Sequence, residues 1–156
     1  MRILNLILSL ACINALGKTA PETIKEWERQ ATKGDPSAQT KMGRVFELGL
    51  DPITKDPVVA ASWYQRAADQ GDAEAQLAIG SKYYLGEGVV KNYVYAYTYF
   101  NLAASRTNTT LGGLAEASRA MVESIMTPSQ IEAGQKLSLE LQKEIDAKNT
   151  AKEQKK

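Results

Sequence analysis

The stretch Gly34-Asp-Pro-Ser-Ala38-Gln39-Thr-Lys-Met42-Gly43-Arg-Val-Phe46-Glu-Leu-Gly49 decides the fold, because it returns as Gly71-Asp-Ala-Glu-Ala75-Gln76-Leu-Ala-Ile79-Gly80-Ser-Lys-Tyr83-Tyr-Leu-Gly86. Matched residues lie 37 positions apart. Farther along, Ala60-Ala-Ser-Trp63-Tyr64-Gln-Arg-Ala67-Ala68 returns as Ala96-Tyr-Thr-Tyr99-Phe100-Asn-Leu-Ala103-Ala104 at an offset of 36, so the first copy holds one extra residue in between. A period of this length indicates a solenoid of repeated supersecondary units.

Each copy is expected to form two helices. In the first helix, apolar and small residues recur at steps of three and four, which places them on one face of an α-helix. In the second helix, alanines alternate with large aromatic residues that we expect to fill the space between helices: Trp63, Tyr64, Tyr99 and Phe100. The pattern predicts an all-α protein.

Capping residues set the expected ends of these helices. Gly49 and Gly86 follow the last periodic residue of the first helices, where glycine adopts the left-handed cap most easily. Asp56 and Asn92 precede the second helices as N-cap residues, and Pro57 stands at the first helical position, which tolerates a missing N–H.

The complete pattern resembles the Sel1-like repeat (SLR), a relative of the tetratricopeptide repeat (TPR). It reads Gly-Asp-x-x-Ala-Gln-x-x-hydrophobic-Gly-x-x-aromatic-x-x-Gly-x-Gly-Val, followed by Ala-x-x-Trp-Tyr-x-x-Ala-Ala. The second copy keeps Gly86-Glu-Gly88-Val89, whereas the first reads Gly49-Leu-Asp-Pro-Ile-Thr-Lys at that place. The resemblance implies an α-α superhelix of antiparallel helix pairs, with repeats at about 34–70 and 71–106.

Helices are also expected on both sides of the repeats. Residues 22–33 align with a second helix and are read as a half-repeat. Beyond the repeats we expect two capping helices, at about 112–126 and 128–147, which cover the open face of the last repeat. The first has an apolar stripe of Leu114, Met121, Val122 and Ile125, and the second one of Ile131, Leu137, Leu141 and Ile145; between them, Thr127-Pro-Ser-Gln130 has the form of a capping box. The solenoid domain is placed at 18–147, and 148–156 is expected to be a polar, frayed tail.

The first 17 residues have the form of a signal peptide. Arg2 supplies the positive charge, residues 3–13 form a short apolar run, and Ala15 and Gly17 are spaced like a cleavage site. Two alternatives are a lipoprotein signal at Cys12 and a buried N-terminal helix. Cleavage would leave Lys18 at the N-terminus and a chain without cysteine, in a bacterial periplasm or outside the cell and without stable membrane insertion.

Composition argues against several function classes. The chain has 156 residues, 19 Lys plus Arg, 18 Asp plus Glu and no His, so it carries no single-sign field that would attract nucleic acid. Without His, the commonest general base and metal ligand is missing. We expect no catalytic residue, no cofactor and no metal: Gly17-Lys18-Thr19 lacks the first glycine of a P-loop, and Asn108 is an acceptor for glycans only in a eukaryotic secretory route.

The tyrosines between 93 and 99 allow two interpretations. Their alternation with other residues suggests a stacking surface for nucleic acid or sugar. The repeat register instead places them on a helix, where Tyr99 and Phe100 are core and Tyr95 and Tyr97 face outward or toward the next unit. We favour packing against the following helix.

Binding of a protein or peptide is the expected function. In the related TPR folds the first helix of each pair lines a concave groove, so the positions beside the core stripe become candidate contacts. They are Thr40, Lys41, Arg44, Glu47 and Leu48 in the first copy, and Leu77, Ser81, Tyr84 and Leu85 in the second. Lys41 and Arg44 suit a carboxylate, and the leucines and the tyrosine suit an apolar side chain. Alternatively, the cations form a solvated face and Leu85 caps the core.

The sequence thus predicts an exported, noncatalytic interaction module. A cell-envelope enzyme, or the regulatory subunit of an envelope enzyme complex, is the alternative function. A further possibility is a structural subunit whose terminal helix docks on another copy.

Overall fold

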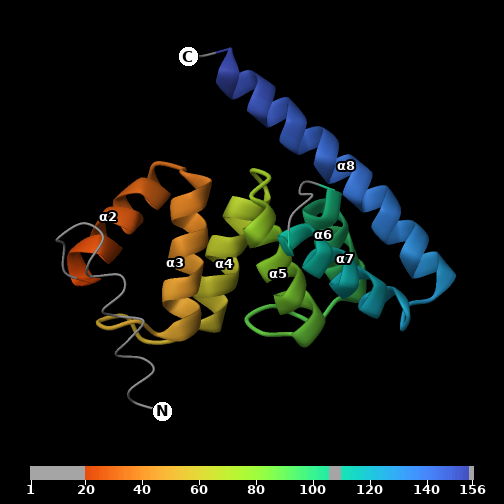
Figure 1. Ribbon diagram of the computed structural model, residues 1–156, viewed down its shortest axis with the longest axis horizontal. Coiled ribbons are helices and arrows are strands. Elements are labelled where there is room, and N and C mark those ends of the chain that lie inside the picture. Colours follow the sequence, from red (N-terminus) through yellow and green to blue (C-terminus); the bar gives the residue numbers. More distant parts are fainter. Residues whose placement is uncertain (1–19, 106–109, 155–156) are drawn as a thin grey trace.

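The computed structural model describes residues 20–105 and 110–154, and within them the backbone forms seven α-helices and no strand. The helices are α2 (Ala20–Thr32), α3 (Pro36–Leu48), α4 (Pro57–Ala68), α5 (Ala73–Leu85), α6 (Tyr93–Ser105), α7 (Thr110–Glu123) and α8 (Pro128–Glu153). The helices α2 to α7 follow one another through the stack in chain order, and the long α8 lies against α6 (Figure 1). The predicted all-α stack of helix pairs is confirmed.

The first helices of the two repeats are capped at both ends, and the glycine caps are the predicted ones. The carboxylates of Asp35 and Asp72 accept the backbone N–H groups of Ala38 and Ala75 at 2.6 and 2.8 Å, which satisfies donors that have no partner inside the helix. At the other end Gly49 and Gly86 take φ values of 68° and 77°, the left-handed conformation that glycine adopts without strain.

The second helices pack their aromatic rings against glycines of the first helices. A Cβ atom at Gly43 would lie 2.6 Å from the Tyr64 ring, and one at Gly80 would lie 2.7 Å from the Phe100 ring. Both rings are 1% exposed. The absence of a side chain at these glycines therefore sets how closely α3 approaches α4 and α5 approaches α6.

The core is continuous from repeat to repeat. Phe46 packs against both the cluster around Met42 and the cluster around Tyr64, and Tyr83 joins the latter to the cluster around Phe100. The prediction that Trp63 is core is only partly met, since its ring is half-buried and Arg66 lies 4.8 Å from the ring centroid.

The first connection closes with the same backbone hydrogen bond as the second despite its extra residue. The N–H of Asp56 donates to the carbonyl of Phe46 at 2.9 Å, and the N–H of Asn92 donates to the carbonyl of Tyr83 at 2.9 Å. These pairs match at the offsets of 36 and 37 that the sequence shows. The departure from the repeat pattern after Gly49 therefore leaves the closure of the loop unchanged.

Repeated glutamine amides tie successive helices together. The side chain of Gln39 donates to the carbonyl of Ala31 at 3.1 Å, and that of Gln76 donates to the carbonyl of Ala68 at 3.2 Å. Each bond links the first helix of a pair to the end of the preceding second helix. Helix α2 thus relates to α3 as α4 relates to α5, as expected for a half-repeat.

The apolar stripe predicted for α7 is wrong at three of its four positions. Only Val122 is buried, whereas Leu114, Met121 and Ile125 are 56%, 46% and 51% exposed. The buried face of α7 also contains Gly112 and Ala115, because small residues allow close packing of the helix. The large apolar residues therefore predicted the wrong buried face for α7.

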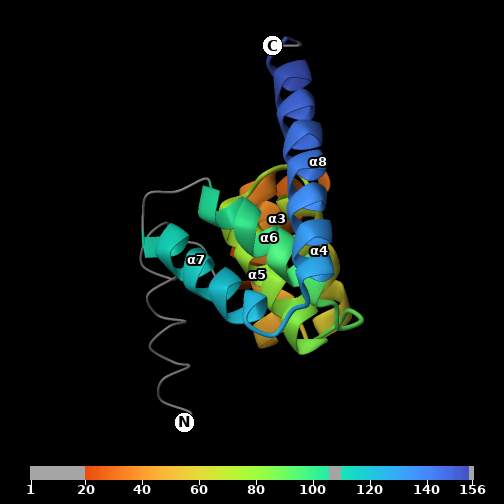
Figure 2. The ribbon, with the colours of Figure 1, turned by 90° about the vertical axis from the view of Figure 1, so that its right-hand side faces the viewer.

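Helix α8 covers the last repeat and runs longer than predicted. Its capping box is present, with Gln130 N–H donating to the Thr127 hydroxyl at 3.3 Å and Thr127 N–H donating to the Gln130 side chain at 2.9 Å. The helix ends at Glu153 instead of 147, and its C-terminal end projects past the other helices (Figure 2). The helix thus continues through 148–153, where the sequence predicted the start of a frayed tail, and there Lys148 pairs with Glu144 at 3.9 Å and Lys152 donates to Gln70 at 2.6 Å.

The aromatic residues of α6 pack as helix residues. Tyr97, Tyr99 and Phe100 are at most 3% exposed, and Tyr97 lies against Gly134 of α8. Tyr95 is 40% exposed and stacks on Tyr83 with ring centroids 5.0 Å apart. The expected signal peptide at 1–17 and the glycan acceptor Asn108 lie outside the described residues.

Candidate protein-interaction face

The first-helix face comprises the eight predicted contact residues of α3 and α5: Lys41, Arg44, Glu47 and Leu48, and Leu77, Ser81, Tyr84 and Leu85. The ninth candidate, Thr40, is not part of it. Thr40 is 4% exposed, and its hydroxyl group lies 3.0 Å from the Pro36 carbonyl and 3.1 Å from the capping carboxylate of Asp72. Its role is to connect α3 to the start of α5.

The two cations of α3 are exposed but already have neighbours. The ammonium of Lys41 lies 5.7 Å from the centroid of the Trp27 ring on α2. Arg44 forms an ion pair with Glu74 of α5, with the arginine side chain 57% exposed. A partner carboxylate would therefore compete with Glu74 for Arg44, in an exposed setting where a single ion pair is weak.

Glu47 serves the interior more than the surface. One carboxylate oxygen accepts a hydrogen bond from the Tyr64 hydroxyl at 2.6 Å, and the other lies 2.5 Å from the ammonium of Lys82. Burial raises the pKa of Glu47, but the hydrogen bonds from Lys82 and Tyr64 outweigh that effect and the pKa is lowered overall. Burial, together with the nearby Glu47 carboxylate, also raises the pKa of Tyr64.

Lys82 is the residue that the sequence interpretation missed. It is 5% exposed and stands in the register of Val45, a buried apolar position of the first repeat. A lysine at a core position of an otherwise regular repeat was a readable signal, because buried lysines are rare unless they are paired.

The apolar members of the face divide into two groups. Leu77 and Tyr84 are half-buried and pack against the cluster that holds Tyr97 and Phe100, and Ser81 donates its hydroxyl to the Leu77 carbonyl at 3.0 Å. Leu48 and Leu85 end their helices and are 62% and 54% exposed. Leu85 is therefore exposed and does not cap the core.

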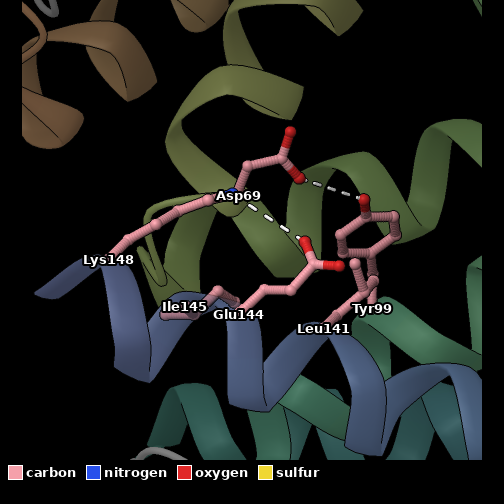
Figure 3. Close-up of a pocket in the computed structure, with 6 residues that line it drawn as sticks. All are labelled: Asp69, Tyr99, Leu141, Glu144, Ile145 and Lys148. Atoms are coloured by element: carbon pink, nitrogen blue, oxygen red, sulfur yellow. Dashed lines mark hydrogen bonds and ion pairs between the residues drawn. The ribbon is translucent and has the colours of Figure 1, made fainter.

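A small polar cavity lies between α8 and the turn after α4 (Figure 3). Its volume is about 110 Å³, and it is lined by Asp69, Tyr99, Leu141, Glu144, Ile145 and Lys148. Asp69 accepts from the Gln65 amide at 2.7 Å and from the Tyr99 hydroxyl at 3.3 Å. The cavity is smaller than an organic ligand requires and has room for only a few water molecules.

The described residues contain neither a cluster of metal ligands nor a membrane-spanning helix. Between residues 20 and 154, apart from 106–109, no three carboxylate or cysteine side chains come together as a metal site would need. Over the same described residues, no helix combines the length and the apolar character of a membrane span.

The sequence profile of the Sel1 repeat matches residues 36–72 and 73–108. The Sel1 repeat protein of Oxalobacter formigenes has a solved structure that superimposes with a TM-score of 0.60 at 31% identity, over 70% of this chain and 84% of that one. The chain belongs to the Sel1-like repeat family. A protective antigen of uropathogenic Escherichia coli with an SLR fold also superimposes, with a TM-score of 0.73 at 29% identity, over 85% of this chain and 27% of the antigen.

Curated relatives of this Sel1-like repeat protein are much longer than the matched region. The chitin synthase regulator SKT5 of Saccharomyces cerevisiae is 30% identical over 58% of this chain and 13% of its own length. An ubiquitin-protein ligase component of Arabidopsis thaliana, HRD3A, described as ERAD-associated, is 35% identical over 39% of this chain and 9% of its own length. Sel1 repeat proteins are protein-interaction modules, and their fold is typically a noncatalytic scaffold.

Proposed function

We propose that this Sel1-like repeat protein is a noncatalytic adaptor that acts in a bacterial periplasm or outside the cell. It binds a peptide or a partner protein on the first-helix face. The partner contributes a carboxylate for Lys41 and Arg44 and an apolar side chain for the α5 end of the face.

The exposure of the first-helix face is the observation that carries this proposal. Lys41, Arg44, Leu48 and Leu85 are all exposed on the first helices of two adjacent repeats. Cations next to exposed leucines can pair with a carboxylate and cover apolar surface in the same contact, and such pairs discriminate between partners more than they add affinity. Because Glu74 already pairs with Arg44, a single carboxylate of a partner gains little there. A partner with more than one acidic residue is therefore favoured.

Export is supported by the first 17 residues, which have the sequence form of a signal peptide. Expression of the full chain in a bacterial host, followed by fractionation and N-terminal sequencing, tests this part. We expect the periplasmic or secreted protein to begin at Lys18. A protein that stays in the cytoplasm with Met1 in place would contradict export and leave the interaction surface to be tested separately.

The binding face is tested by photo-crosslinking in the native host from a reactive residue at Ser81. The variant Lys41→Glu/Arg44→Glu reverses two charges on the face, and Lys136→Glu/Lys143→Glu reverses two exposed charges on α8 as the matched control. We expect the crosslinked species to disappear in the first variant and to persist in the control. Equal crosslinking in both variants would exclude the first-helix face.

A second candidate function is suggested by the names of the relatives. Two curated relatives are a chitin synthase regulator and a chitin synthase regulatory factor, the latter from Schizosaccharomyces pombe with 35% identity over 41% of this chain and 7% of its own length. By analogy, the chain would be the regulatory subunit of an envelope enzyme. Purified chain added to envelope fractions depleted of it would then restore an enzyme activity, whereas a simple adaptor would leave every activity unchanged.

A further inference from the structure

Exposed aliphatic side chains gather on one edge of the molecule. We define the loop edge as the connections 49–56, 86–92 and 124–127 with the helix residues that adjoin them; Figures 1 and 2 show these connections along the same lower edge. Of the ten exposed large hydrophobic residues in the described parts of the chain, six lie there, with exposures from 40% to 88%: Leu48, Leu50, Val58, Leu85, Val90 and Ile125.

Two of these residues occupy one register position. Leu48 and Leu85 lie 37 residues apart and are the last residues of α3 and α5, so they mark equivalent points of two successive helix pairs. Ile125 lies in the turn after α7.

The opposite edge of the molecule is polar. Its described connections, 33–35 and 69–72, hold Asp35, Asp69, Gln70 and Asp72 and no exposed large hydrophobic residue. Apolar exposure is therefore concentrated on one edge instead of being scattered over the surface, where single exposed residues need no explanation.

The loop edge is continuous between the repeats. Gly88 has a φ of 74°, and a Cβ atom there would overlap the carbonyl oxygen of Pro57. The second connection thus lies directly on the first turn of α4, and Val90 and Val58 belong to one surface.

Charges of both signs repeat along the loop edge. Asp51 and Lys55 in the first connection correspond to Glu87 and Lys91 in the second, at the offset of 36. All four are exposed, and Glu87 also pairs with Lys82 at 2.9 Å. Asp51, Lys55 and Lys91 form no ion pair with another described residue. A partner surface of one charge sign would match only half of this pattern.

We propose that the loop edge is the interface of a two-fold symmetric dimer. A two-fold axis places the same patch of both copies in contact, so a surface of alternating acids and lysines is complementary to itself. The first connection then faces the second connection of the partner subunit, with Lys55 near Glu87 of the partner subunit and Asp51 near Lys91 of the partner subunit. The exposed leucines meet between these charges, and burial of their apolar surface drives the association.

The dimer covers Leu48 and Leu85, which also belong to the first-helix face, so a partner and a second copy compete for these two leucines. Lys41, Arg44 and Ser81 remain outside the loop edge and available to a partner. The crosslinking experiment at Lys41 and Arg44 and the association experiment below can therefore fail separately.

Sedimentation velocity of the chain from Lys18, which keeps every described helix, tests the dimer between about 1 μM and about 500 μM. We expect a monomer–dimer equilibrium whose dissociation constant rises at least about tenfold in Leu48→Ser/Leu85→Ser. The control Leu114→Ser/Leu139→Ser removes two equally exposed leucines from α7 and α8 and should leave it unchanged. A monomer over the whole range, an equal effect of the control, or growth beyond the dimer would overturn the proposal. Circular dichroism checks that every variant is folded.

A charge exchange tests the pairing itself. Lys91→Glu places a carboxylate opposite Asp51 of the partner subunit and should weaken the dimer about tenfold. Asp51→Lys/Lys91→Glu restores opposite charges on both sides of the axis and should recover the original association. A double variant as weak as Lys91→Glu alone would contradict the two-fold arrangement.

Discussion

The ammonium of Lys82 lies 2.5 Å from a carboxylate oxygen of Glu47, so a nearly buried cation of α5 is paired with an anion of α3. The same ammonium lies 2.9 Å from Glu87 in the connection after α5. Burial alone lowers the pKa of Lys82, but the hydrogen bonds to the two carboxylates raise it overall. The pair joins the two repeats through charge as well as through apolar packing.

Replacement of this cation should destabilise the stack. Lys82→Met keeps most of the apolar stem but leaves Glu47 half-buried without the ammonium and with only the Tyr64 hydroxyl as a donor, and we expect the free energy of unfolding to fall by about 2 kcal/mol. Urea denaturation measures the change. Adding Glu47→Gln removes the unpaired charge and should recover about half of the loss. The control Lys143→Met, at an exposed site on α8, should change the value by less than about 0.5 kcal/mol.

Stability should decrease in acid through Glu47. Because its pKa is lowered in the folded chain by Lys82, Tyr64 and Lys55 against the opposing effect of burial, the unfolded chain binds the proton more tightly. The stabilisation is complete above the ordinary value of 4.5 and is lost as the pH falls through the folded pKa. Below about pH 5, the free energy of unfolding should therefore decrease less with falling pH in Glu47→Gln than in the unchanged chain. Parallel pH profiles would refute the assignment.

The glycine beside Phe100 should not tolerate a methyl group. Gly80→Ala would bring a Cβ atom within 2.7 Å of the buried ring, and we expect a loss of about 2 kcal/mol despite the better helix propensity of alanine. Gly113→Ala on α7 is the matched change, since beyond the chain neighbours and the backbone of its own helix nothing lies within 4 Å of its Cβ position. That variant should be more stable by up to about 1 kcal/mol. Thermal unfolding of both proteins decides between close packing and propensity.

The projecting end of α8 should contribute little stability. Removal of residues 148–156 deletes the exposed pairs of Lys148 with Glu144 and of Lys152 with Gln70 but keeps the buried Ile145. Exposed pairs of this kind are worth at most about 1 kcal/mol in total. A loss of more than about 2 kcal/mol on truncation would show that the last turns of α8 are part of the cooperative fold.

The helix pairs and their ends could be predicted from local sequence. The residues Asp56, Asn92, Gly49 and Gly86 act on the turns next to them, and glycine or a short polar side chain satisfies those turns wherever the helix packs. The small residues of the first helices and the aromatic residues of the second could also be assigned to the core, because the repeat shows each of them twice at a fixed offset.

The candidate face was less predictable. Register alone placed Thr40, Glu47 and Leu77 beside Lys41 and Arg44, yet Thr40 bonds to Asp72, Glu47 holds Lys82, and Leu77 packs toward the core. Each of these roles depends on a side chain from a neighbouring helix, which a periodicity within one helix does not report. The predicted buried face of α7 was also wrong, because this helix packs against its neighbours through Gly112 and Ala115.

The repeat, the cap residues and the helical spacing of small and aromatic residues by themselves determined that this chain folds as stacked helix pairs of the Sel1-like family. Only the tertiary structure decided that Lys82 is paired inside the stack, that Leu114, Met121 and Ile125 face outward, and that exposed leucines align along the loop edge. The reason is one of range: backbone caps and helical periodicity act over a few residues, whereas burial and charge pairing depend on which neighbour the chain brings alongside.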